Sequence, residues 1–320
     1  MYEFLLSSDF MVPDPDATTA LLVAKLGVRE HPRWRQAFPN HSYIAWFLRA
    51  HPSLAVAPTR LETQGHRHVD NPSDPCFQPF LQSLIDFQGA GRPMKTHALV
   101  LITRRFDELV EKLMRRRLPF RIAPRSDEMP FDRLWVGVTP ENPRYSPCVD
   151  GGLVIEVLPV EPLQMPAETF STPPPEPREP KPGDMVRIVS RGILVRDLDE
   201  TLRLLSTNLN WEPAGPITTV EAEGTRIARM RFGLAHSASV DLIEPYRGDR
   251  EAGAYLNVWG PGPYYTRISV TGLDAKAEDL RKRGTRFAVV ESASAPRGRA
   301  LRVDPRDLDG IRVEFVEHMG

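Results

Sequence analysis

The stretch HALVLITRRFDELVEKLMRRRLPF, residues 97–120, contains the pattern that decides the fold. Its opening is a run of apolar and β-branched side chains, which is typical of a strand. A short polar turn follows, and then apolar side chains recur at i, i+3, i+4 and i+7: Phe106, Leu109, Val110 and Leu113. This spacing predicts a helix that buries one stripe of its surface.

The same strand, turn and helix pattern occurs three more times, at residues 5–28, 190–211 and 265–287. Four copies of one pattern indicate an internal repeat rather than coincidence. After each predicted helix come further segments with the apolar alternation of strands. The repeating unit is therefore predicted to be βαβββ.

The repeat predicts an α+β fold with four βαβββ modules that form two paired-module domains. One such unit leaves a face of its curved sheet uncovered, so two must associate to bury it. A chain of 320 residues fits two domains, each with its own core. Prolines are too dense in residues 161–184 for a helix or a central strand, which predicts a semi-rigid linker. The predicted domains are residues 1–160 and 185–320.

Charge and composition restrict the partners. The 41 Lys and Arg residues nearly balance 42 Asp and Glu residues, so neither nucleic acid nor an anionic membrane is expected as a partner. A small-molecule substrate or ligand fits this balance, and a homodimer stays possible. No apolar run approaches the roughly 18 residues that a membrane helix needs. Two cysteines without a metal-binding spacing, and a start without a basic leader region, predict a cytoplasmic protein.

Two short motifs accompany the repeat. A V-x-D-L-D turn spans residues 195–199, and a late G-x-x-x-E strand occurs at residues 152–156 and again at 310–314. With the fourfold repeat, these motifs resemble the vicinal oxygen chelate superfamily, which includes glyoxalase I, methylmalonyl-CoA epimerase, extradiol dioxygenases and bleomycin resistance proteins. The resemblance covers almost the whole chain except the linker, and it implies paired glyoxalase-like domains. Fold alone says little about the reaction.

The resemblance implies a metal site in the first half. Three short sequence segments are similar to those of glyoxalase I: L-E-T around Glu62, H-A-L-V-L-I from His97 and I-E-V around Glu156. These three residues would be metal ligands, and the ion would be Zn, Ni, Mn or Fe. The fourth ligand position falls on Ser7, which departs from the usual His or Gln. A register shifted by two would place Asp9 there, on the same strand face.

The resemblance places a different set of residues in the second half: Ser190, Asp241, Tyr265 and Glu314. Because this set has no histidine, the second domain is expected to be metal-free and to act as a structural partner or a small-molecule cup. The stretch WGPGPYY, residues 259–265, would either line that cup or connect two modules against the core.

These features favour a metal-dependent lyase or isomerase that acts on a small oxygenated substrate, with Glu156 as the group that transfers a proton. Two alternatives stay open: a non-catalytic protein that binds a drug or antibiotic, and an atypical dioxygenase. Neither half supplies the two histidines and one carboxylate of a conventional ring-cleaving enzyme. His97 would equally suit a hydrogen-bonded structural position, and reversed strand parity would turn Glu62 and Glu156 toward solvent.

Overall fold

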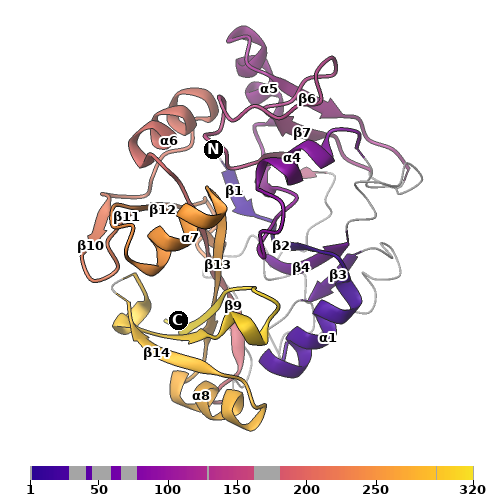
Figure 1. Ribbon diagram of the computed structural model, residues 1–320. Coiled ribbons are helices and arrows are strands. Elements are labelled where there is room, and N and C mark those ends of the chain that lie inside the picture. Colours follow the sequence, from indigo (N-terminus) through magenta and orange to yellow (C-terminus); the bar gives the residue numbers. More distant parts are fainter. Residues whose placement is uncertain are drawn as a thin grey trace.

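The fold is taken from a computed structural model that describes residues 2–28, 41–44, 59–65, 78–127, 130–161, 181–292 and 294–319. Strands and helices of the first half, indigo to magenta in Figure 1, lie on one side of the molecule. Those of the second half, orange to yellow, lie on the other side.

The second half is built on one sheet of eight strands. Two long central strands, β9 and β13, pair antiparallel, and each is followed by a helix, α6 (Leu198–Leu204) or α8 (Leu273–Lys282). On each side of this centre, a module's first strand pairs with its fourth, the fourth with the third and the third with the second. The sheet order is β10 (Thr218–Val220), β11 (Thr225–Met230), β12 (Ser239–Pro245), β9 (Met185–Leu194), β13 (Gly262–Val270), β16 (Val313–Glu317), β15 (Arg299–Val303) and β14 (Phe287–Glu291).

The first half repeats this topology with a broken opening strand. Its two parts, β1 and β2, are joined at Leu6, whose N–H donates to the Val100 carbonyl and whose carbonyl accepts from the Arg60 N–H, each at 2.8 Å. One sheet runs β1 (Tyr2–Leu5), β5 (Leu99–Thr103), β8 (Ile155–Pro159), β7 (Arg133–Val136) and β6 (Phe120–Ala123). The other runs β2 (Ser7–Val12), β4 (Arg60–Gly65) and β3 (His41–Ile44).

Helices α1 (Pro15–Leu26) and α5 (Phe106–Arg115) belong to the modules of the first half, whereas α4 (Leu81–Phe87) and α7 (Glu251–Trp259) connect one module to the next. Figure 1 shows α1, α5, α6 and α8 at the periphery and α4 and α7 nearer the centre. In α5, Phe106, Leu109 and Leu113 are buried and Val110 packs against the same core, as the sequence spacing predicts. Short helical turns lie at Leu205–Leu209, Pro296–Gly298 and Pro305–Asp307.

The two halves share part of their core. The largest cluster of buried apolar side chains contains residues from both. Tyr2, for example, packs its ring edge-on against Trp211 at 5.6 Å, and its hydroxyl donates to the Leu209 carbonyl at 3.1 Å. The expectation of two separate cores was therefore wrong, because apolar side chains at the contact between the halves continue from one to the other.

The α+β prediction is confirmed, and three modules show the complete βαβββ order within the described residues. In the first module the described residues form the two-part opening strand β1 and β2, the helix α1 and two further strands, β3 and β4, so the count of four complete modules stays a prediction. The domain boundaries also stay predictions, since most of the linker at residues 161–184 lies outside the described residues.

Candidate functional site

The opening strand of the first half contributes Asp9. Strand β2 pairs in parallel with β4, and this register sets Asp9 beside Glu62. Neighbours in such a register point to the same face of the sheet. Asp9 is 1% exposed, and its carboxylate accepts hydrogen bonds from the Thr96 hydroxyl and from the His97 N–H, the latter at 2.8 Å.

His97 lies between two carboxylates. Its Nδ1 is 3.0 Å from Asp9 Oδ2, and its Nε2 is 3.2 Å from Glu156 Oε2. The backbone hydrogen bond from His97 to Asp9 fixes the place where the ring leaves the chain, just before β5. Two acids distant in sequence therefore meet opposite edges of one imidazole.

Glu156 reaches the site from the last strand of the second module. Strand β8 pairs in parallel with β5 and antiparallel with β7, where Trp135 is the cross-strand partner of Glu156. The Trp135 ring meets the His97 ring edge-on at 6.0 Å. Glu156 and Trp135 are both buried, so the carboxylate and imidazole face each other largely away from water.

Glu62 is buried on the same sheet face as Asp9, and its carboxylate accepts from Gln64 Nε2 at 2.7 Å. The structure thus brings His97 and Glu156 into direct contact and places Glu62 one strand away from Asp9. Ser7 is buried, and its hydroxyl has no hydrogen-bond partner among the described residues. Of the two candidates for the opening strand, Asp9 is the one that contacts His97.

The electrostatics follow from this contact. Burial alone would raise the pKa of Asp9, but His97, the hydrogen bond from Thr96 and the more distant Arg191 outweigh burial and lower it. Burial alone would lower the pKa of His97, but the carboxylates of Asp9 and Glu156 outweigh burial and raise it well above its usual value. The site therefore attracts positive charge strongly.

The donor set suits a divalent cation, although no three His, Cys, Asp or Glu side chains among the described residues form a ready metal-binding cluster. Asp9 beside Nδ1 favours a proton on that nitrogen. Nε2 then points its lone pair at the Glu156 carboxylate, which is favourable only if a second proton or a cation lies between them. A metal-bound histidine commonly has this arrangement, with a carboxylate on its other nitrogen.

The equivalent positions of the second half contain guanidinium groups. The β9 residue beside Asp241 is Gly192, and the cross-strand partner of Gly192 on β13 is Tyr265. Tyr265 donates to Asp241 Oδ2 at 2.9 Å. Arg267 bonds Glu314 at 2.7 Å and lies 3.9 Å from Asp241.

More arginines complete this cluster: Arg229 bonds Asp241 at 2.7 Å, and Arg302 bonds Glu314 at 2.8 Å. Sequence reasoning identified Asp241, Tyr265 and Glu314 but missed these arginines. A signal was present, because Arg267 follows Tyr265 by two residues and therefore shares its strand face. Ser190, the remaining predicted position, is buried, and its hydroxyl has no partner in the described part of the chain.

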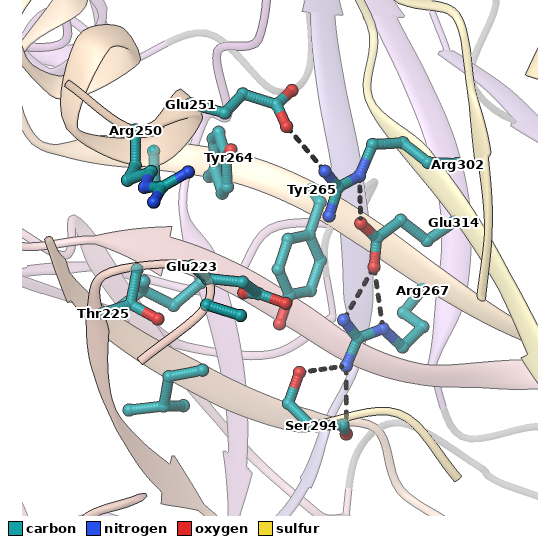
Figure 2. A pocket seen from close by; sticks show the side chains of 14 residues that line it. Glu223, Thr225, Arg250, Glu251, Tyr264, Tyr265, Arg267, Ser294, Arg302 and Glu314 are labelled. Atoms are coloured by element: carbon teal, nitrogen blue, oxygen red, sulfur yellow. Dashed lines mark hydrogen bonds and ion pairs between the residues drawn. The ribbon is translucent and has the colours of Figure 1, made fainter. Parts of the chain in front are cut away.

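A cavity of about 230 Å³ lies over this cluster (Figure 2). Residues of β11, β13, β15 and β16 and the start of α7 line it. Tyr264 and Tyr265, which belong to the aromatic stretch at residues 259–265 and lie in the opening strand β13, are among its lining residues. No described helix has the length and apolar character required to cross a bilayer.

Residues 191–301 match the family model described as "Glyoxalase/Bleomycin resistance protein/Dioxygenase superfamily". The chain therefore contains a domain of this superfamily, in agreement with the resemblance found in the sequence. No curated protein matches the chain.

Several solved structures are similar to less than half of the chain. Methylmalonyl-CoA epimerase from Mycobacterium tuberculosis is 23% identical over 42% of this chain and 88% of its own, with a TM-score of 0.37. The Streptomyces coelicolor epimerase in complex with 2-nitronate-propionyl-CoA is 26% identical over 43% of this chain and 100% of its own, with a TM-score of 0.38. A hypothetical protein from Bacillus halodurans is 20% identical over 42% of this chain and 95% of its own, with a TM-score of 0.38.

Proposed function

We propose that this chain, in which residues 191–301 form a domain of the glyoxalase/bleomycin resistance/dioxygenase superfamily, is a metal-dependent isomerase or lyase. Its reaction takes place in the first half. The observation that carries the proposal is the position of His97, with Asp9 at one ring nitrogen and Glu156 at the other.

In this proposal His97 Nε2 and Glu156 hold a divalent ion of the Zn, Ni, Mn or Fe type, and Glu62 supplies a third donor. Nitrogen and carboxylate oxygen are the ligand types that these ions accept. The Asp9 carboxylate orients the imidazole, because it accepts a hydrogen bond from the backbone N–H of His97 and also faces Nδ1 of the His97 ring. When bound, the ion would polarise a substrate carbonyl and stabilise the negative charge that develops on the carbonyl oxygen.

Glu156 is the residue that we assign to proton transfer. Its carboxylate is buried, which limits competition from water, and it contacts His97 through a single oxygen, Oε2. A carboxylate in this position can take a proton from the carbon beside a substrate carbonyl and return it. The expected substrate is small and carries two neighbouring oxygen atoms. Trp135, beside the imidazole, forms an apolar wall of the site.

The contacts in the second half of the chain favour ligand binding over catalysis in that half. Its carboxylates Asp241 and Glu314 are already paired with guanidinium groups, and an open cavity lies above them. This observation supports small-molecule binding without turnover as the competing function, as in a drug- or antibiotic-binding protein. An atypical dioxygenase is less well supported, since the donor set of the first half contains one histidine rather than two.

Metal analysis of the purified protein tests the proposal directly. The wild type is expected to retain about one equivalent of a divalent ion, and His97→Ala and Glu156→Gln are expected to lose it. Arg203→Met, which alters an exposed ion pair on α6, serves as the control. An ion content that is unchanged in His97→Ala would contradict the metal site.

Isomerase chemistry is tested by hydrogen exchange. The metal-loaded protein is incubated in D₂O with a panel of thioesters and 2-hydroxy ketones, and deuterium uptake at the carbon beside the carbonyl is measured by mass spectrometry. Uptake that requires both the metal and Glu156 supports the proposal. Metal binding without uptake on any substrate would instead favour the binding function.

A further inference from the structure

The cavity over the second-half cluster has a floor whose charges are already paired. Glu314 receives hydrogen bonds from Arg267 and Arg302, and Glu251 receives them from Arg302 and Arg312. Figure 2 shows the part of this chain that runs from Glu251 through Arg302 and Glu314 to Arg267. A fully paired floor has little capacity left for a metal ion, because each carboxylate already has a cationic partner.

Arg267 has a central place in this floor. Its side chain is 3% exposed and lies within reach of both Asp241 and Glu314, at 3.9 and 2.7 Å. Its guanidinium also stacks over the Tyr265 ring at 4.6 Å and donates to the Ser294 carbonyl. A fixed side-chain cation thus sits between the two acids that correspond to the predicted metal ligands of the first half.

The wall of the cavity contains polar groups that lack partners. The Thr225 hydroxyl is buried and has no hydrogen-bond partner among the described residues, and Thr225 itself is 1% exposed. Glu223, in the turn before β11, lines the cavity, and its carboxylate acts on Arg302 across the cavity wall without an ion pair closer than 4 Å among the described residues. The Arg250 guanidinium lies 4.0 Å from Asp249, its one ion pair within the described part of the chain.

Arg250 and Glu223 carry opposite charges and lie apart in Figure 2, with Arg250 near Tyr264 and Glu223 below it in the view. A buried hydroxyl without a partner is costly, and it gains most when a ligand supplies the missing hydrogen bond. A guanidinium pairs with a carboxylate, and a carboxylate pairs with a cation such as an ammonium group. The tyrosine side chains between them favour an apolar or aromatic body.

We propose that this cavity is a metal-independent binding site for a small amphoteric molecule. The ligand carries a carboxylate that pairs with Arg250, an ammonium group that pairs with Glu223, and a compact ring or chain that packs on Tyr264 and Tyr265. The Arg267 guanidinium takes the place of a metal ion and holds the floor in position. This site is separate from the one proposed in the first half.

Three compounds of one shape test the charge requirement by isothermal titration calorimetry on the full chain. They are 4-(aminomethyl)benzoate, which carries both charges, 4-methylbenzoate, which carries only the carboxylate, and 4-methylbenzylamine, which carries only the ammonium group. The first is expected to bind about fivefold more tightly than either of the others, since each loses one partly exposed ion pair worth about 1 kcal/mol.

Two variants locate the binding. With Arg250→Met, the amphoteric compound should bind no more tightly than 4-methylbenzylamine, and with Glu223→Gln no more tightly than 4-methylbenzoate. Arg281→Met, which removes an exposed arginine of α8, is the matched control and should bind like the wild type. His97→Ala should also bind like the wild type, which separates this site from the first half.

Three results would overturn the proposal. The first is that none of the compounds binds at millimolar concentration. The second is equal affinity for the amphoteric compound and a singly charged one. The third is binding that is unchanged by both Arg250→Met and Glu223→Gln, which would place the compounds elsewhere.

Discussion

The guanidinium of Arg191, in the second half of the chain, donates from Nη2 to the backbone carbonyl of Asp9 at 3.1 Å. Its Nη1 donates to the Ser8 hydroxyl at 3.0 Å and to the Thr266 hydroxyl at 2.6 Å. Arg191 is 1% exposed and lies over the Phe10 ring at 5.0 Å. The second half therefore fixes the strand that carries Asp9 into the candidate site.

Replacing Arg191 should destabilise the protein. Arg191→Met removes the donor to the buried Asp9 carbonyl and leaves the Ser8 and Thr266 hydroxyls to bond each other, so we expect the free energy of unfolding to fall by about 2–3 kcal/mol. Urea denaturation measures this change. Arg203→Met, at an exposed pair with Glu200, should leave the midpoint unchanged. Equal midpoints for the two variants would show that the contact between the halves contributes little.

The two opening-strand candidates should differ in their effect on metal affinity. Asp9→Asn weakens the acceptor that orients His97, and loss of such a partner typically costs about 10–100-fold in affinity. Ser7→Ala removes a hydroxyl that has no hydrogen-bond partner among the described residues, so affinity should stay at the wild-type value. Competition with a chromophoric chelator measures both. A loss of metal affinity in Ser7→Ala but not in Asp9→Asn would assign the opening-strand position of the site to Ser7.

Asp150 should make stability depend on pH. Burial raises its pKa to about 6 despite hydrogen bonds from the Tyr145 hydroxyl and from the backbone N–H groups of Gly152 and Ile155. Because this pKa is higher in the folded than in the unfolded state, the protonated carboxyl group stabilises the fold. This stabilisation is complete below the unfolded-state pKa of 3.8 and is lost as pH rises through about 6.

The matched variant is Asp150→Asn, whose side chain does not titrate. The unfolding free energy of the wild type minus that of the variant should increase by about 1 kcal/mol when pH falls from about 7.5 to about 5. Urea titrations at several pH values measure this difference, in which contributions from other titrating groups cancel. A difference that decreases over this range would mean that the folded state prefers the ionised carboxylate.

Gly192 makes room for Tyr265 in the second half. An added Cβ there would lie 2.7 Å from carbons of the Tyr265 ring. Gly192→Ala should displace the ring, lengthen its 2.9 Å hydrogen bond to Asp241 and lower the free energy of unfolding by about 1–3 kcal/mol. At Gly215 an added Cβ meets no atom within 4 Å, so Gly215→Ala is the control. Similar unfolding midpoints for the two variants would contradict close packing at Gly192.

Much of the architecture could be predicted from periodicity. The stripe of Phe106, Leu109 and Leu113 is buried as its spacing implies, because a helix that packs on a sheet must bury one face. The resemblance to a known family placed His97 and Glu156 in one site, and their side chains lie 3.2 Å apart, whereas their role as metal ligands stays a prediction. The break of the opening strand at Leu6 was not, since it depends on pairing with two different sheets.

Strand periodicity could not distinguish Ser7 from Asp9, because residues two apart share a face and only the contacts decide between them. The arginines of the second half were missed for a different reason. Arginine is normally exposed, and Arg191 and Arg267 are buried only because acceptors from distant parts of the chain surround them. The sequence does not show those acceptors as neighbours.

The most direct measurement is anomalous scattering from crystals of the cobalt-loaded protein. The account predicts one strong peak within about 2.0–2.3 Å of His97 Nε2 and of a Glu156 carboxylate oxygen, with Asp9 at the other ring nitrogen. A peak elsewhere, or none while both ring nitrogens of His97 stay in contact with carboxylates, would contradict the metal site.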